Sequence, residues 1–307
     1  MSIRLFDGHC DTAFALWRRK ASLRQNTCHV DLCKANAFKA YAQVFAFCSH
    51  AGLPQYRSWK PEAMLLRPLE NFRQEIIENA DSIACVRTKE EISAVNAEHK
   101  TAALLSMEGP EVIGCDPERL AWLRQQGFCM TTLTWNADNS LAGSHKSDIG
   151  LTDRGRAFVR ASQELGILVD VSHLSEKAFW DLISVTEKPI LASHSNCRAL
   201  RNVTRNLTDD QLRAISETGG TVGLNLYTDF LGEKADYSVL RQHLEHMLTI
   251  CGEDHVALGG DLDGCDSLPE GFDDLSGYCG FYAFLQQAGY SEALLDKIFY
   301  RNLQKLF

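Results

Sequence analysis

The sequence predicts an α/β fold, and within that class a (β/α)8 TIM barrel. The main observation is a rhythm in which eight short apolar runs, suited to buried parallel strands, alternate with amphipathic stretches suited to helices. A second observation is that no G-x-G-x-x-G loop follows the first run, which weighs against an open dinucleotide-binding sheet. A third is that no linker or low-complexity tract interrupts the 307 residues. We therefore expect residues 1–307 to form a single barrel domain.

The expected strands are short and apolar, as strands buried on both faces are. They occupy residues 3–11, 41–47, 102–109, 128–135, 166–173, 189–195, 220–227 and 255–264. A further short run, at residues 82–88, is a candidate for an extra strand outside the eight. Parallel barrel strands all end at one rim, and barrel active sites lie there. We therefore expect the functional side chains at these strand ends.

Five of the intervening stretches read clearly as helices: residues 61–79, 153–165, 175–186, 208–218 and 237–250. Two of them begin with a capping signal, because Ser175 and Thr208 each stand before acidic first-turn residues. Gly166 and Gly219 follow two of the helices, where a left-handed glycine ends a helix well. These signals support the alternation of strands and helices.

The composition excludes several classes of protein. A net charge of −9 argues against nucleic acid as a partner, since phosphate binding needs a concentrated Lys/Arg surface. No apolar run is long enough to cross a bilayer, and no export signal opens the chain. The eleven cysteines are odd in number and contain no C-x-x-C pair, so we expect reduced structural thiols. We expect a cytoplasmic protein with no membrane partner.

Side chains that bind metals gather where the expected strands end. His9 and Asp11 lie two apart at the end of the first strand, so the pleat turns both to the same face. Glu108 ends the third strand. The fifth, sixth and eighth strands end in His173, His194 and Asp261.

Three imidazoles and three carboxylates at one rim form the mixed nitrogen and oxygen set that suits Zn²⁺ and its first-row neighbours. A single histidine or aspartate at a strand end is more often an ordinary loop residue, but contributions from five strands are hard to explain in that way. The crowded groups would also raise each other's cost of ionisation unless a cation were present. The set suits two ions bridged by a carboxylate and by a water acidified to hydroxide, which is a nucleophile for hydrolysis.

The remaining histidines are expected to play lesser parts. His145, in the loop after the fourth strand, overhangs the rim and is a candidate to touch substrate. His243 and His246 do not match the H-E-x-x-H spacing and are expected on a solvated helix face. The others are expected to be ordinary surface groups: His29, His50, His99 and His255.

Longer motifs around these residues extend over nearly the whole chain. They are DGHCD, SMEG, GLTDRGRAFVRASQELGILVDVSHLS, ASHSNCRAL, TRNLTDDQL, and HVALGGDLDG followed by LPEGFDDLS. Together they resemble the membrane (renal) dipeptidase family of zinc metallopeptidases, especially its soluble bacterial members. The resemblance implies a barrel of the metal-dependent hydrolase type, with a binuclear zinc site that hydrolyses dipeptides.

The resemblance also implies how the ions would be held. His9, Asp11 and Glu108 would bind one zinc ion. Glu108, His173 and His194 would bind the other, so that Glu108 is the bridging carboxylate. Manganese and cobalt accept the same ligands, so other divalent metals stay open.

Further roles follow from the same resemblance. Asp261, which taken alone could be a ligand, would instead carry a proton from the bridging water to the leaving amine. Arg205 would hold the terminal carboxylate of the substrate through two parallel hydrogen bonds. Tyr227 would line the substrate pocket.

One position departs from the family pattern. The mammalian enzymes end the fourth strand in a histidine that helps to stabilise the oxyanion, and Trp135 stands there in this chain. An indole N–H donates one hydrogen bond but carries no positive charge. Either the second metal alone stabilises the oxyanion, or one of three residues substitutes: Asn136, Asn139 or His145.

The sequence thus predicts a cytoplasmic binuclear zinc dipeptidase acting on dipeptides with a free C-terminal carboxylate; the family's habit suggests a homodimer. The alternative is a metal-dependent amidohydrolase for N-acyl or D-amino-acid-containing substrates, since each presents an amide beside a carboxylate. A third reading, a non-catalytic barrel protein, predicts missing ligands, whereas every expected ligand is present.

Overall fold

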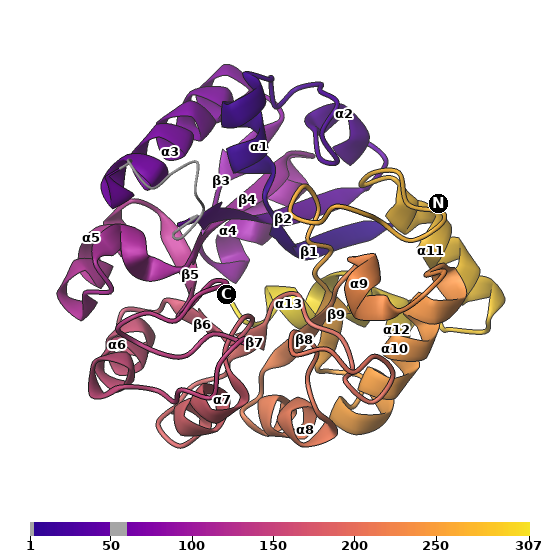
Figure 1. The fold of residues 1–307 in the computed structure, drawn as a ribbon. Coiled ribbons are helices and arrows are strands. Elements are labelled where there is room, and N and C mark those ends of the chain that lie inside the picture. The colour runs from indigo at the N-terminus through magenta and orange to yellow at the C-terminus, as the bar shows by residue number, and fades with distance from the viewer. Residues whose placement is uncertain (1–2, 50–59) are drawn as a thin grey trace.

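The computed structural model describes residues 3–49 and 60–307. Eight parallel strands close into a barrel, and the helices form an outer ring around it (Figure 1). The order around the barrel is β1-β2-β4-β5-β6-β7-β8-β9, and β9 pairs with β1 to close it. The predicted (β/α)8 barrel is confirmed.

The strands of the second half of the barrel are shorter than the sequence predicts. The barrel strands are β1 (Arg4–Cys10), β2 (Ala40–Cys48), β4 (Thr101–Glu108), β5 (Phe128–Thr132), β6 (Leu168–Asp170), β7 (Leu191–Ala192), β8 (Thr221–Leu224) and β9 (Val256–Leu258). The chain leaves the ladder before it reaches the predicted site residues, so His173, His194 and Asp261 lie in loops just beyond their strands. The extra strand also exists, as β3 (Ile83–Cys85), which pairs with the start of β4.

The five predicted helices all form, with ends that shift by at most a few residues. The longer helices are α1 (Thr12–Arg19), α3 (Pro61–Glu78), α4 (Lys89–Ala97), α5 (Leu120–Gln125), α6 (Asp153–Glu164), α7 (Glu176–Ile183), α8 (Asp209–Glu217), α10 (Tyr237–Cys251) and α11 (Gly277–Gln287). Short segments are α2 (Leu32–Ala35), η2 (Pro110–Ile113), η3 (Pro117–Arg119), α9 (Thr228–Leu231), α12 (Glu292–Asp296), η4 (Lys297–Arg301) and α13 (Asn302–Gln304). Ser175 and Thr208 cap α7 and α8 as predicted.

An aromatic cluster ties the last segment of the chain to the first strand. The Phe6 ring stacks on the Phe307 ring, with centroids 5.7 Å apart, and also contacts Tyr300. Leu303 is buried in the same cluster. Phe6 and Phe307 lie near opposite ends of the described chain, so their stacking joins those two ends.

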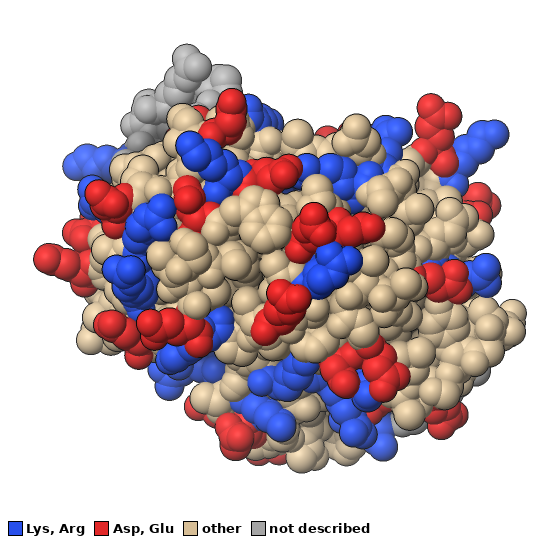
Figure 2. Space-filling view, turned by 90° about the horizontal axis from the view of Figure 1, so that it is seen from below, with Lys and Arg blue, Asp and Glu red and all other residues tan. Residues whose placement is uncertain are grey.

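The cysteines, the described helices and the charged side chains can each be compared with the predictions from composition. All eleven cysteines lie in the described part of the chain, and each is a free thiol, as predicted. None of the described helices combines the length and the apolar character needed to cross a bilayer. Figure 2 shows basic and acidic side chains interleaved over the face that it draws.

Candidate metal centre and substrate pocket

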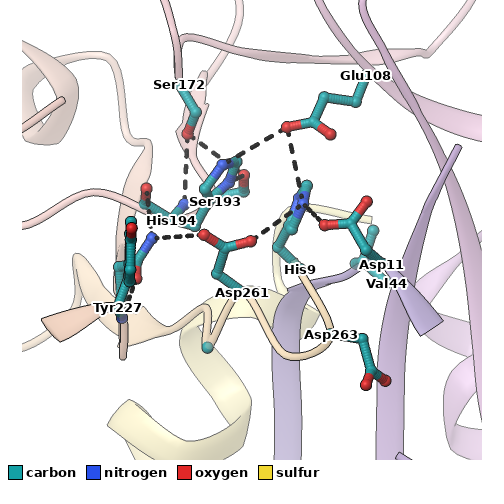
Figure 3. A network of polar contacts seen from close by, with 12 residues as sticks. His9, Asp11, Val44, Glu108, Ser172, Ser193, His194, Tyr227, Asp261 and Asp263 are labelled. Carbon is teal, nitrogen blue, oxygen red and sulfur yellow. Dashed lines mark hydrogen bonds and ion pairs between the residues drawn. The ribbon is translucent and has the colours of Figure 1, made fainter. Parts of the chain in front are cut away.

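The side chains predicted to bind metal converge on one point at the carboxyl ends of the strands. Figure 3 shows four of them: His9, Asp11, Glu108 and His194. Glu108 Oε1 lies 3.0 Å from His173 Nε2, 3.6 Å from His194 Nε2 and 3.7 Å from His9 Nε2. Asp11 Oδ2 lies 3.5 Å from His9 Nε2. The chain brings these groups together from four separate segments, with Glu108 between the three histidines.

The convergent groups divide into overlapping triplets of a size that fits one ion each. His9, Asp11 and Glu108 each offer a ligand atom within 4.8 Å of the others, and so do Glu108, His173 and His194. Glu108 belongs to both triplets. These are the two ligand sets that the family resemblance implies, so the arrangement suits a pair of ions on either side of one carboxylate.

Asp261 lies close enough to take either of its two candidate roles. It forms a third triplet with His9 and His194, and its Oδ1 is 3.9 Å from His9 Nε2. Its Oδ2 accepts a hydrogen bond of 3.3 Å from the amide of Asn225. The residue has a left-handed φ of 57°, which the loop after β9 imposes and which turns the carboxylate into the site.

His9 tests whether the site fits a metal. The side chain is only 1% exposed, yet neither ring nitrogen has a hydrogen-bond partner among the described residues. A buried polar atom without a partner is costly and rare in native proteins. A cation at Nε2, shared with the nearby carboxylates, satisfies the atom, so the residues present fit a divalent metal.

The pKa values of the cluster without a bound ion also indicate that the site suits a cation. Burial lowers the pKa of His9, but the carboxylates of Glu108, Asp11 and Asp261 outweigh it and raise the pKa to about 10. Burial raises the pKa of Glu108 to about 8, against the opposing effect of His9. Burial likewise raises the pKa of Asp261 to about 6. Without an ion, bound protons therefore offset the negative charge of the carboxylates. Metal cations would offset the same charge in the loaded site.

Asn136 fixes the orientation of His173. Its Oδ1 lies 3.1 Å from His173 Nδ1, and a ring that donates from Nδ1 presents the Nε2 lone pair to the centre. The same Oδ1 lies 3.1 Å from His145 Nε2, while His145 Nδ1 lies 2.8 Å from Thr204 Oγ1. Both ring nitrogens of His145 are thus engaged by neighbouring side chains. Burial, together with Arg205 and Lys146, lowers the pKa of His145 to about 3, which keeps it neutral.

A second chain of hydrogen bonds orients His194. Ser193 Oγ lies 2.6 Å from His194 Nδ1 and donates to Asp170 Oδ2. Asp170 Oδ1 accepts from the backbone N–H groups of Ser172 and Ser193. A serine that donates to aspartate accepts from His194 Nδ1, which leaves Nε2 free to bind a metal. Asp170 and Ser193 were not predicted as site residues, although both lie inside the motifs that resemble the family.

Asp7 joins β1 to the loop that carries Asp261. Its carboxylate accepts hydrogen bonds from the backbone of His9, from the backbone of Gly260 and from the Tyr278 hydroxyl. The register of β1 against β2 shifts between Asp7 and Cys10. His9 faces the centre, while its neighbour Cys10 points to the other side of the strand and packs in the core.

Two glycines allow the backbone and the carboxylates to approach closely. A Cβ at Gly259 would lie 1.6 Å from the Ser193 carbonyl oxygen. A Cβ at Gly264 would lie 2.1 Å from Asp11 Oδ2 and 2.4 Å from Asp261 Oδ1. The GGDLDG motif therefore needs glycine at these two positions, because any side chain there would displace the site residues.

A cavity of about 810 Å³ opens over the centre. Asp11, Glu108, His173 and Asp261 lie in its wall. All the predicted substrate-binding residues also line it: Trp135, His145, Arg205 and Tyr227. Tyr227 packs edge-to-face on Phe230, with ring centroids 4.8 Å apart.

Arg205 is a buried cation that no described carboxylate pairs with. It is 6% exposed, and its guanidinium donates to the His194 carbonyl oxygen at 3.2 Å and contacts Ser195 Oγ. Its carbon Cζ stands 5.3 Å from the centre of the Phe230 ring. Burial lowers the pKa of Arg205, and three carboxylates oppose that shift without forming an ion pair with the guanidinium: Asp261, Glu108 and Asp170. Arg205 is therefore available to an anionic group of a substrate.

The remaining histidines, which were predicted to lie at the surface, differ in how far they are buried. The prediction for His243 is wrong: it is buried, its Nδ1 accepts from the Cys197 backbone and its Nε2 lies 3.1 Å from the Leu231 carbonyl oxygen. The reason is that α10 turns this residue toward the loop after β7. His29 and His255 are half-buried, and His99 is exposed. His50 lies outside the described residues.

The family model for membrane dipeptidase, peptidase family M19, matches residues 1–307. The chain belongs to the membrane dipeptidase family. The chain is also similar to two curated proteins. An uncharacterized protein of Klebsiella pneumoniae is 39% identical over 55% of this chain and 67% of its own length. An uncharacterized dipeptidase of Schizosaccharomyces pombe is 31% identical over 67% of this chain, which spans only 52% of that protein.

Solved structures of membrane dipeptidase family members superimpose closely. A metallopeptidase from Rhodobacter sphaeroides, liganded with a phosphinate mimic of L-Ala-D-Ala, is 29% identical with a TM-score of 0.92 and covers 100% of this chain and 99% of its own. A second metallopeptidase of the same family, dipeptidase AC, is 30% identical with a TM-score of 0.91 and covers 100% and 98%. The predicted family and the metallodipeptidase class are confirmed, and membership implies a divalent metal.

Proposed function

We propose that this protein is a binuclear zinc dipeptidase acting on dipeptides with a free C-terminal carboxylate. The observation that carries the proposal is the pair of ligand triplets that share Glu108. His9 and Asp11 complete one triplet, and His173 and His194 complete the other. Imidazole and carboxylate together suit Zn²⁺. The orphaned ring of His9 and the hydrogen bonds that orient His173 and His194 support the same assignment.

The pair of ions would supply a bridging water acidified to hydroxide and a Lewis acid for the peptide carbonyl. The chain would then handle the proton. Asp261 offers an oxygen within 4.8 Å of ring nitrogens of His9 and His194. A carboxylate in this position can accept a proton from the water and return it to the leaving group. We assign Asp261 the transfer of a proton to the leaving amine.

Arg205 would anchor the C-terminal carboxylate of the substrate. Its burial and its lack of a described carboxylate partner support this role, because a buried guanidinium binds a carboxylate strongly. The test compares a dipeptide with its C-terminal amide. The parent enzyme should strongly prefer the free acid, and R205A should lose that preference, whereas R201A, at a neighbouring arginine, should keep it.

Asn136 is the best-placed replacement for the missing family histidine. Asn139 is excluded, since its amide donates to Glu111 and Leu133 and its oxygen accepts from the backbone. His145 has both ring nitrogens engaged. The Asn136 oxygen serves the two histidines, so its NH2 group can donate to the negative charge that develops on the carbonyl oxygen. Trp135, His145 and Tyr227 would shape the pocket wall.

The deciding experiment joins metal analysis to a substrate panel. The purified protein should contain about two zinc ions per chain and hydrolyse dipeptides. E108Q should lose metal and turnover together, while E118Q, at an exposed glutamate, should lose neither. A fully metallated and active E108Q would contradict the bridging role. A metal-loaded protein that hydrolyses no amide would favour the non-catalytic barrel.

The substrate panel also separates the alternative. L-Ala-L-Ala, L-Ala-D-Ala and N-acetyl-L-alanine each present an amide beside a carboxylate. L-Ala-D-Ala belongs in the panel because a mimic of it is bound to the Rhodobacter sphaeroides relative. Turnover of the acyl substrate alone would establish the amidohydrolase reading. A cytoplasmic location and a homodimer stay predictions, to be tested by cell fractionation and by light scattering.

A further inference from the structure

A second cavity lies at the opposite end of the barrel, where the strands begin. It has a volume of about 530 Å³, within the usual range for small-molecule sites. The starts of β5 and β6 and the last residues of the described chain form its apolar wall: Cys129, Ile167, Leu168, Val169, Leu306 and Phe307. In Figure 1 the C-terminus is drawn beside β6 and β7. This wall is well fixed, since Phe307 stacks on Phe6.

Cationic side chains ring this apolar wall: Arg87, Arg124, Lys188 and Lys305. No carboxylate of the described residues forms an ion pair with any of them, and three of the four side chains donate to backbone oxygens. Arg124 Nη1 donates to the Phe128 carbonyl oxygen at 3.4 Å. Lys188 Nζ donates to that of Gln163 at 2.5 Å, and Lys305 Nζ to that of Asp254. The charges of Arg87, Arg124 and Lys188 are therefore not neutralised by an ion pair among the described residues.

The acidic side chain in the cavity wall, Asp254, acts on Lys305 and also pairs with a lysine outside the cavity. Asp254 is the acidic residue among those that line the cavity, and its Oδ1 lies 2.8 Å from Lys297 Nζ. A concentration of unpaired cations is unexpected in a chain with a net charge of −9. Like charges around one cavity repel, and an anion bound between them removes the repulsion.

Two of the cations stand close enough to act on one group. Burial raises the pKa of the Cys129 thiol to about 12, and both Arg124 and Arg87 oppose that rise. Arg87, Arg124 and Cys129 all line the cavity. Paired arginines bind carboxylate or phosphate oxygens through charge-assisted hydrogen bonds.

We propose that this cavity binds an amphipathic organic anion, with a carboxylate or phosphate group held by the cations and an apolar chain against the wall of β5, β6 and the C-terminal residues. A ligand with only the negative charge, or with only the apolar chain, would use only part of the cavity and should bind more weakly. The proposal is independent of the metal centre, which lies at the other rim of the barrel.

The first test is calorimetric titration of the zinc-loaded protein with decanoate, below its micelle concentration. Saturable one-to-one binding is expected, and decyl phosphate shows which anionic head group is preferred. Decanol and decyltrimethylammonium, which keep the chain and lose the negative charge, should bind at least about tenfold more weakly. Equal binding of all four probes would overturn the proposal. Displacement of decanoate by a dipeptide would also overturn it, by placing the anion at Arg205.

The second test uses variants. R87Q combined with K188Q should weaken decanoate binding at least about tenfold, while R160Q, an exposed cation of α6 outside the cavity, should leave it unchanged. Dipeptide kinetics and the thermal midpoint should stay at parental values in all variants, which shows that the fold is intact. Unchanged decanoate affinity in a folded R87Q/K188Q variant would refute the site.

Discussion

The side-chain oxygen of Asn136 contacts both His173 and His145, so this one residue orients two histidines of the site. The metal role of His173 requires a proton on Nδ1, so the amide oxygen, and not its nitrogen, must face that ring. The NH2 group then remains for the substrate. Neither half of this role can be inferred from LTWNADN, because the sequence does not show that His173 and His145 meet at the same atom.

The matched variant for Asn136 is aspartate. N136D keeps the acceptor for the two histidines and removes the NH2 donor, so kcat should fall about 10²–10³-fold with little change in KM. N136L, which also releases His173, should in addition lose metal. Steady-state kinetics with metal analysis distinguish the two variants. Parental kcat in N136D would leave the second ion as the only source of oxyanion stabilisation.

The raised pKa of His9 links metal binding to pH. In the metal-free protein the three carboxylates hold a proton on His9 up to about pH 10, and a bound cation must displace it. Zinc binding at pH 8 should therefore release about one proton or more per chain, and zinc affinity should rise about tenfold per pH unit below the pKa. Calorimetry in buffers of different ionisation enthalpy measures this release. Binding without release would mean that His9 is not a ligand.

At the scale of elements, the site depends on how tightly β7, β8 and β9 come together. The Ser193 carbonyl oxygen leaves no room for a Cβ at Gly223 or Gly259, and the Ser193 hydroxyl orients His194. The sequence predicted the strands and the helix caps because apolar runs and capping residues act locally. It did not predict where β6 to β9 stop, since that depends on pairing between distant segments.

G259A tests this close packing. The added methyl group would force the Ser193 carbonyl aside, so the unfolding free energy should fall by about 1–3 kcal/mol and zinc affinity should fall as well. G289A is the control: its φ is 92° and the space around it is open, so a loss of about 1 kcal/mol without any effect on metal is expected. Denaturant unfolding and metal titration give the two values. Wild-type zinc affinity in G259A would show that this packing does not support the site.

At the scale of the whole molecule, the ligands come from β1, β4 and the loops after β6 and β7, so the centre exists only when the barrel closes. The strand rhythm and the polar strand ends were sufficient to predict this from sequence. The hydrogen bonds of Asp170, the burial of His243 and the cations at the opposite rim were not predictable. Each joins residues that are distant in sequence and that carry no metal-binding pattern of their own.

A closed barrel held by bound ions should unfold as one unit. If residues 1–307 form a single domain, fluorescence and circular dichroism should report the same transition. Chelation of the metal should lower its midpoint, because each ion at 100 times its Kd adds about 2.7 kcal/mol to the folded state. Two separate transitions would contradict the single domain. An unchanged midpoint after chelation would show that the ions do not bind the folded state preferentially.

The most direct test of the two-metal centre is an anomalous difference map at the zinc absorption edge, from crystals grown with zinc. We expect two peaks about 3.5–4 Å apart, on either side of the Glu108 carboxylate. One peak would be bound by His9 and Asp11, the other by His173 and His194. A single peak, or peaks away from Glu108, would contradict it.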